Sequence, residues 1–229
     1  MEIESLNQTI IQCRKCPRLV EYREMVAQKK KKAYMDWVYW GRPVPAFGDI
    51  VGRVLVVGLA PGPHGSNRTG RMFTGDASGV FLFAALHRAG FANQAECYSR
   101  DDGLVVHDML ISAVCRCAPP ENKPNAVEIA NCRPYLEREI GLMKNLQGFV
   151  ALGRIAFDNI LKVYRRWEVD VPRFEFRHGS VYQIGEAGPW LIASYHPSQQ
   201  NTQTRRLTVN MFDEIWKQVR SMLVEYLPK

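Results

Sequence analysis

Four of the six cysteines have a spacing that suits a metal centre. Cys13 and Cys16 form a C-x-x-C knuckle, whereas Cys117 and Cys132 are separated by a proline-rich loop and the first turns of an expected helix. Four thiolates can bind zinc or an iron–sulfur cluster, and spacing alone does not distinguish the two. The lack of a second C-x-x-C unit disfavours a zinc ribbon, and the alternative is that all four are small buried hydrophobic residues.

A glycine-rich loop over residues 58–76 (GLAPGPHGSNRTGRMFTGD) carries groups that could bind a ligand and react with it. Its glycines allow a ligand to approach the backbone closely. The loop contains neither G-x-G-x-x-G nor the lysine of a P-loop, so nucleotide-cofactor interpretations lose their main support. Phe73 could stack on a nucleobase or belong to the core. Asp76 could cap the next helix, act as a catalytic carboxylate, or do both.

A second loop, residues 194–207 (SYHPSQQNTQTRRL), follows an expected buried strand. His196 comes directly after that strand, which places it at the edge of the sheet where ligands bind. A single histidine is more often structural, but here the neighbouring hydroxyls, amides and arginines suit contact with phosphate groups. A functional role is therefore favoured for His196.

The elements that would position these loops are strands alternating with helices. Short apolar runs predict strands at 53–59, 109–115, 149–152 and 191–195, and helical patterns cover 6–26, 76–88, 125–143 and 207–226. The first helix is expected to break near Cys16-Pro17, and the Gly/Pro-rich residues 41–52 are expected to form a loop. The order predicts one α/β domain over residues 1–229. It has three layers and is doubly wound, with a central four-stranded, mainly parallel sheet flanked by helices.

Composition narrows the class of partner. The net charge of +7 permits a polyanionic partner, and the run from Lys29 to Lys32 is either a solvated surface or a contact to a DNA backbone. No apolar run is long enough for a membrane span, and the amino terminus resembles neither a secretory signal nor a transit peptide. We expect a cytoplasmic protein without a membrane partner, in which Cys97 is simply buried and Cys115 is ambiguous.

Segments spread over nearly the whole chain resemble the uracil-DNA glycosylase superfamily, most closely its iron–sulfur branch, family 5. The matching segments are CRKCPRL (13–19), GLAPG (58–62), NRTGRMFTGD (67–76), CAPPENKP (117–124), NCRPYL (131–136), ALGR (151–154) and YHPSQQNTQT (195–204). Family 4 relatives carry a glutamate second in the G-x-A-P-G loop and an asparagine four residues before the third cluster cysteine. This chain has Leu59 and Ala113 there, which favours family 5.

The resemblance implies a 4Fe–4S cluster with Cys13, Cys16, Cys117 and Cys132 as ligands, while Cys115 falls where relatives have none. It also implies removal of uracil, and of some other deaminated bases such as hypoxanthine, from DNA. Such an enzyme must extrude the nucleotide from the stack before it cuts the bond between base and sugar.

The implied roles follow from the charges that develop in this reaction, positive on the sugar and negative on the base. We expect Asp76 to orient water and stabilise the cationic sugar, and His196 to donate a hydrogen bond to the departing base. The expected base-binding residues are Gly58, Leu59, Ala60, Phe73, Ala113 and Asn122. The expected DNA contacts are His64, Asn67, Arg68, Ser198, Asn201, Thr202, Arg205, Arg206 and Leu207; the last either wedges into the stack or starts the final helix.

Two other classes of function remain open from the residues. One is a non-catalytic, metal-containing module that binds nucleic acid, which the placement of Asp76 and His196 at two strand ends disfavours. The other is a phosphoesterase acting on free nucleotides, which would need a cluster of carboxylates for a divalent metal near these loops. We expect a monomer, and protein partners are not predictable.

Overall fold

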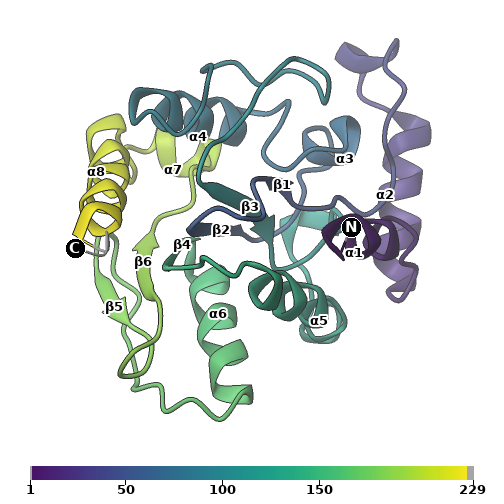
Figure 1. Ribbon diagram of the computed structural model, residues 1–229. Helices are drawn as coiled ribbons and strands as arrows, with labels where there is room; N and C mark the ends of the chain where they lie inside the picture. Colours follow the sequence, from purple (N-terminus) through teal and green to yellow (C-terminus); the bar gives the residue numbers. More distant parts are fainter. Residues whose placement is uncertain (1, 226–229) are drawn as a thin grey trace.

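The computed structural model describes residues 2–225, and its centre is a six-stranded sheet with helices on both faces (Figure 1). The strand order is β1-β3-β2-β4-β6-β5. The inner four strands are parallel and are β2 (Val54–Gly58), β3 (Met109–Ala113), β4 (Gly148–Leu152) and β6 (Trp190–Ser194). Every residue in them is buried, as is typical of parallel strands that are covered on both faces.

The expected α/β class is confirmed, but the expected number of four strands is wrong. Two short strands, β1 (Phe47–Gly48) and β5 (Val181–Gln183), add to the edges of the sheet in antiparallel orientation. They are two and three residues long and partly exposed, so they lack the run of apolar residues from which a strand is predicted.

Alternate residues of the inner strands face opposite cores, because successive side chains of a strand point to opposite faces. Val54 and Val56 pack in the core that includes α4 (Ala77–Arg88) and α8 (Val209–Glu225). Leu55 and Val57 pack in the core that includes α5 (Ala126–Leu142) and α6 (Arg154–Arg166). The result is the three-layer arrangement that the sequence predicts.

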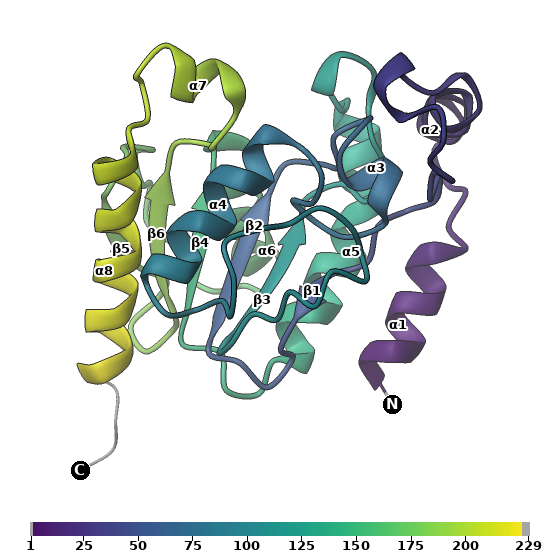
Figure 2. The same ribbon diagram turned by 90° about the horizontal axis from the view of Figure 1, so that it is seen from above.

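The amino-terminal helices lie beside α5, as both views of the ribbon show (Figure 1, Figure 2). They are α1 (Glu2–Ile11) and α2 (Pro17–Lys29), separated at the expected break, with Pro17 at the first position of α2. Leu6 and Ile10 of α1 pack against Tyr135 of α5 in a small separate core. This contact brings the C-x-x-C segment close to the helix that carries Cys132.

Four short helical segments complete the chain: η1 (Lys32–Tyr34), α3 (Ser66–Thr69), η2 (Pro120–Asn122) and α7 (Gln199–Gln203). α4, α5 and α8 begin and end within two residues of their expected bounds, and the helix expected over 6–26 corresponds to α1 and α2 with the break between them. Residue 226 of the last expected helix lies outside the described residues. No helix was predicted over residues 154–166, so α6 was missed. Over residues 2–225, no helix combines the length and the apolar character that crossing a membrane requires.

Candidate active site

A cavity of about 720 Å³ lies where the loops after β2, β3 and β6 meet. These loops leave the carboxyl ends of parallel strands, and α3 and α7 lie beyond that same edge of the sheet (Figure 2). Predicted site residues that line the cavity are Leu59, Ala60, His64, Phe73, Asp76, Ala113, Asn122, His196 and Ser198. The structure thus brings together residues that are as far apart as 59 and 198 in the sequence.

Asp76 caps α4, as the sequence predicts, and also faces the cavity. Its Oδ1 accepts a hydrogen bond from the backbone N–H of Gly79 at 3.0 Å. Its Oδ2 lies against the backbone of the glycine-rich loop at Gly65. The approach is so close that a Cβ built on Gly65 would lie only 2.0 Å from this oxygen. Burial raises the pKa of Asp76, while hydrogen bonds from the backbone of Gly79 and Ser78 and the charge of Arg68 act in the opposite direction.

His196 lies across the cavity in a desolvated position. Burial lowers the pKa of its imidazole to about 4, so the ring is neutral at pH 7 and retains one N–H donor. The Asn201 side chain donates to the His196 carbonyl at 2.8 Å and fixes the start of this loop. The ring stacks on Phe73, with 5.8 Å between the ring centroids.

Phe73 is held in an unusual conformation, with a φ of 52°. A left-handed backbone is unfavourable for a bulky residue and recurs at functional sites. The ring packs over Gly58, where a Cβ would lie 2.6 Å from Cζ of Phe73. Gly58 therefore leaves space for the ring, but this expected base-binding residue is not among those that line the cavity.

The expected DNA contacts divide into two groups. Ser198 and Thr202 are partly exposed, and Arg205 and Arg206 are exposed next to the cavity loop. Asn201 is also partly exposed, but its side-chain amide already donates a hydrogen bond to the carbonyl of His196.

Three of the expected DNA contacts are buried instead. Asn67 is 0% exposed and donates from its side chain to the carbonyl of Arg23, and Arg68 is 4% exposed. Leu207 is also 0% exposed and packs in the core with α4 and α8, so its position does not fit the expected wedge. Asn67 and Arg68 were expected on the surface because they belong to a short run of polar residues. Such a run does not show that other parts of the fold will bury it.

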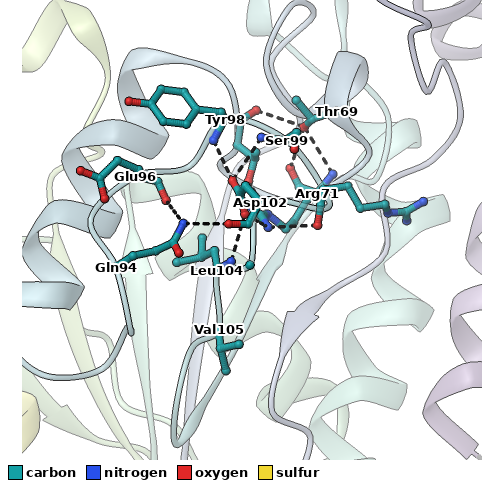
Figure 3. A network of polar contacts seen from close by, with 12 residues as sticks. Thr69, Arg71, Gln94, Glu96, Tyr98, Ser99, Asp102, Leu104 and Val105 are labelled. Atoms are coloured by element: carbon teal, nitrogen blue, oxygen red, sulfur yellow. Dashed lines mark hydrogen bonds and ion pairs between the residues drawn. The ribbon is translucent and has the colours of Figure 1, made fainter.

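A buried ion pair anchors the end of the loop that carries Phe73 (Figure 3). Both guanidinium ends of Arg71 bond to the Asp102 carboxylate at 2.7 Å, and Arg71 Nε donates to the Thr74 hydroxyl at 2.8 Å. Asp102 also accepts from the backbone of Tyr98, Ser99 and Leu104. These donors outweigh burial and lower the pKa of Asp102 to about 2, so the pair stays charged. This anchor was not predicted from the sequence, because Arg71 and Asp102 lie 31 residues apart.

Cys16 and Cys117, two of the four predicted ligands, pack together around Leu19. Cys132 and Cys13 exert electrostatic effects on both, and all four thiols are free. Over residues 2–225, no group of three or more His, Cys, Asp or Glu side chains has the arrangement of a site for a metal ion.

Polar side chains surround the four cysteines. Arg23, only 2% exposed, donates to the Cys117 sulfur at 2.9 Å, and the Asn131 amide donates to the Cys16 sulfur at 3.4 Å. Cys115 lies beside Cys132, and a hydrogen bond between the two side chains raises the pKa of Cys115 and lowers the pKa of Cys132.

The lysine run and the segment after it both contribute to the site. A DNA contact was one of the two interpretations of Lys29 to Lys32, but no role was predicted for residues 34–40. Lys31 and Tyr34 line the cavity. The Tyr39 hydroxyl bonds to Nδ1 of His64 at 3.0 Å. Four aromatic residues within residues 34–40, next to four lysines, were the available signal.

The sequence of this chain is similar to those of known uracil-DNA glycosylases, whose reaction would require a cavity of this kind. The family model of the uracil DNA glycosylase superfamily matches residues 45–220. A type-5 uracil-DNA glycosylase of Thermus thermophilus is 47% identical over 97% of this chain and 99% of its own length. One from Mycobacterium leprae is 48% identical over 96% and 95%, whereas a type-4 enzyme of Pyrobaculum aerophilum is only 30% identical over 86% and 84%. The chain therefore belongs to the uracil-DNA glycosylase superfamily, and within it to the type-5 group.

Proposed function

We propose that this protein removes uracil from DNA by hydrolysing the N-glycosidic bond of a flipped nucleotide, leaving an abasic site. The observation that carries the proposal is the cavity itself, in which a carboxylate, a neutral imidazole and an aromatic ring meet at the edge of the sheet. Its volume lies within the range of pockets that enclose small molecules.

The two polar groups suit opposite ends of the bond. The Asp76 carboxylate stabilises the cationic sugar and orients the attacking water. Its Oδ1 meanwhile keeps its hydrogen bond from the backbone N–H of Gly79 at the start of α4. The neutral His196 donates its N–H to the oxygen of the departing base, where negative charge collects. With a pKa near 4, His196 acts as a hydrogen-bond donor and not as a full acid at neutral pH.

The experiment that tests the proposal is release of free base from an oligonucleotide with a single uracil, in the presence of EDTA. We expect release by the wild type, and a large loss with Asp76→Ala and with His196→Ala. A matched control is His87→Ala, which lies in the last turn of α4, away from the cavity. Binding of the oligonucleotide without any release would favour the non-catalytic module. Release of phosphate would favour a phosphoesterase.

We also propose action on other deaminated bases, including hypoxanthine. Ala113 lines the cavity without a hydrogen-bonding group, and a site with fewer polar requirements rejects fewer bases. Ala113→Asn should therefore raise the ratio of uracil release to hypoxanthine release. An unchanged ratio would contradict this explanation of base tolerance.

A 4Fe–4S cluster on Cys13, Cys16, Cys117 and Cys132 is likewise proposed. The proposal is supported by the four thiols themselves. They are free, they come from two segments that are distant in the sequence, and they interact electrostatically with one another. The buried guanidinium of Arg23 lies next to them and donates to Cys117. A four-iron cluster takes one thiolate per iron, so its ligands need not converge on one point as those of a single zinc ion do. The cluster's contribution would be to tie the start of the chain to the 117–132 segment.

A further inference from the structure

Arg68 is a buried cation held between two aromatic rings. Its guanidinium carbon lies 4.0 Å from the centroid of the Tyr34 ring and 4.0 Å from that of Trp37, and the residue is 4% exposed. The negative face of an aromatic ring attracts a cation, and the attraction grows as water is excluded. The two rings come from the segment that follows the lysine run, so Arg68 connects this segment to α3.

The same guanidinium holds both ends of the loop that carries the catalytic aspartate. Its Nε donates to the carbonyl of His64 at 2.7 Å, and its Nη2 donates to the carbonyl of Gly75 at 2.8 Å. Gly75 directly precedes Asp76 in the chain. Gly75 has a φ of +84°, and a Cβ there would lie 2.5 Å from Nη2, so only glycine allows this approach.

We propose that Arg68 is a positioning residue for Asp76, fixing the backbone on which the carboxylate stands and supplying a positive charge that acts on it, while Tyr34 and Trp37 hold Arg68 in place. The inference rests on the proposed function and deepens it. It also replaces the expectation that Arg68 grips phosphate, because Nε and Nη2 donate to backbone carbonyls and the residue is only 4% exposed.

The charge of Arg68 acts on Asp76 together with a small set of other groups. Arg68 lowers the pKa of Asp76 and opposes the effect of burial, as do the amides of Ser78 and Gly79 at the start of α4. The Cys97 thiol also interacts electrostatically with Asp76, and Lys31, His64, Glu121 and His196 line the same cavity. Loss of the Arg68 charge should therefore raise the pKa of Asp76 further.

The test compares Arg68→Met with Arg68→Lys in single-turnover and steady-state base release. A loop displaced by about 1 Å can lower a rate about 100-fold, and we expect a loss in kcat of that order for Arg68→Met with little change in KM. The acid side of its pH–rate profile should move to higher pH, because the reaction needs Asp76 ionised. Arg68→Lys keeps a positive charge, so its profile should stay near that of the wild type even though kcat falls.

Trp37→Leu provides a second variant in case Arg68→Met does not fold. Trp37 does not line the cavity, so its loss should lower kcat about tenfold through Arg68 alone, without a change in KM. Arg100→Gln is the control: its exposed guanidinium lies over Trp40, and kcat should not change.

Folded Arg68→Met or Trp37→Leu protein with the kcat and pH profile of the wild type would overturn the inference. A wild type that releases no base would instead reject the proposed function.

Discussion

Asp76 serves as a helix cap and faces the cavity, and two substitutions separate these functions. Asp76→Asn keeps an oxygen that can accept from Gly79, whereas Asp76→Ala loses it. Loss of a side-chain cap costs about 1 kcal/mol, within a range of about 0.5–2 kcal/mol. For a protein of this size, 1 kcal/mol corresponds to a change in Tm of about 2–4 °C. We therefore expect Asp76→Ala to melt a few degrees below the wild type.

Asp76→Asn should not melt below the wild type at pH 7, for an electrostatic reason. The folded-state pKa of Asp76 is raised above its value in the unfolded chain, so the folded state binds more protons between these two pKa values. Stability contributed by this group is consequently lost as pH rises through that window, and the loss amounts to about 1.4 kcal/mol per pKa unit. The asparagine variant avoids this loss.

Thermal unfolding of the three proteins at pH 7 and near pH 4 measures both effects, and base release measures activity in parallel. Both variants should lose activity. The advantage of Asp76→Asn over the wild type should shrink as pH approaches 4, while the deficit of Asp76→Ala relative to Asp76→Asn should persist. If Asp76→Asn were as unstable as Asp76→Ala at pH 7, the carboxylate would not be destabilised by burial and the reasoning would be wrong.

Three further predictions concern other parts of the molecule. Asp102→Asn should lower stability by on the order of 3–5 kcal/mol at pH 7, because it leaves buried Arg71 without its counter-charge. Since the pKa of Asp102 is lowered to about 2, the difference from wild type in denaturant unfolding should decline as pH falls from about 4 towards 2. Leu207→Ala should lower the free energy of unfolding, measured with denaturant, by about 2–5 kcal/mol, while base release per folded molecule should not change. Unchanged stability together with weaker DNA binding would instead support the role of Leu207 as a wedge in the base stack. Cys16→Ser should lose iron and the absorbance of a cluster, and should melt earlier than Cys97→Ser if the cluster ties the two segments together; iron retained by the folded variant would count against Cys16 as a ligand.

Most of the fold could be predicted because its inner strands and most of its long helices have strong local patterns. The exception is α6, which was missed although its buried apolar residues recur at helical spacing. The buried runs of β2 and β6, and the capping residue Asp76, are visible in a few adjacent residues. The edge strands were missed because two or three partly exposed residues have no periodicity. Their pairing depends on neighbours that are distant in the chain.

The candidate site was predictable in its residue types but not in its supports. Phe73, Asp76 and His196 lie in segments whose composition points to ligand binding, and they do line one cavity. The burial of Arg68 could not be predicted, because an arginine in a polar loop is normally exposed. It is buried here because Tyr34 and Trp37, from another part of the chain, pack against its guanidinium. Asp102 is likewise an ordinary surface acid until Arg71 is brought beside it.

The contact of α1 with α5 has a consequence for the order in which this chain can fold during synthesis. Leu6 and Ile10 find their partner in Tyr135, more than 120 residues later in the chain. A growing chain that has not yet exposed α5 must carry α1 with its apolar face uncovered, because long-range contacts form only after both partners exist. Helix α1 is therefore synthesised long before it can dock. In the proposed cluster, Cys13 and Cys16 would likewise lack two of the four ligands until the segment with Cys117 and Cys132 has been synthesised.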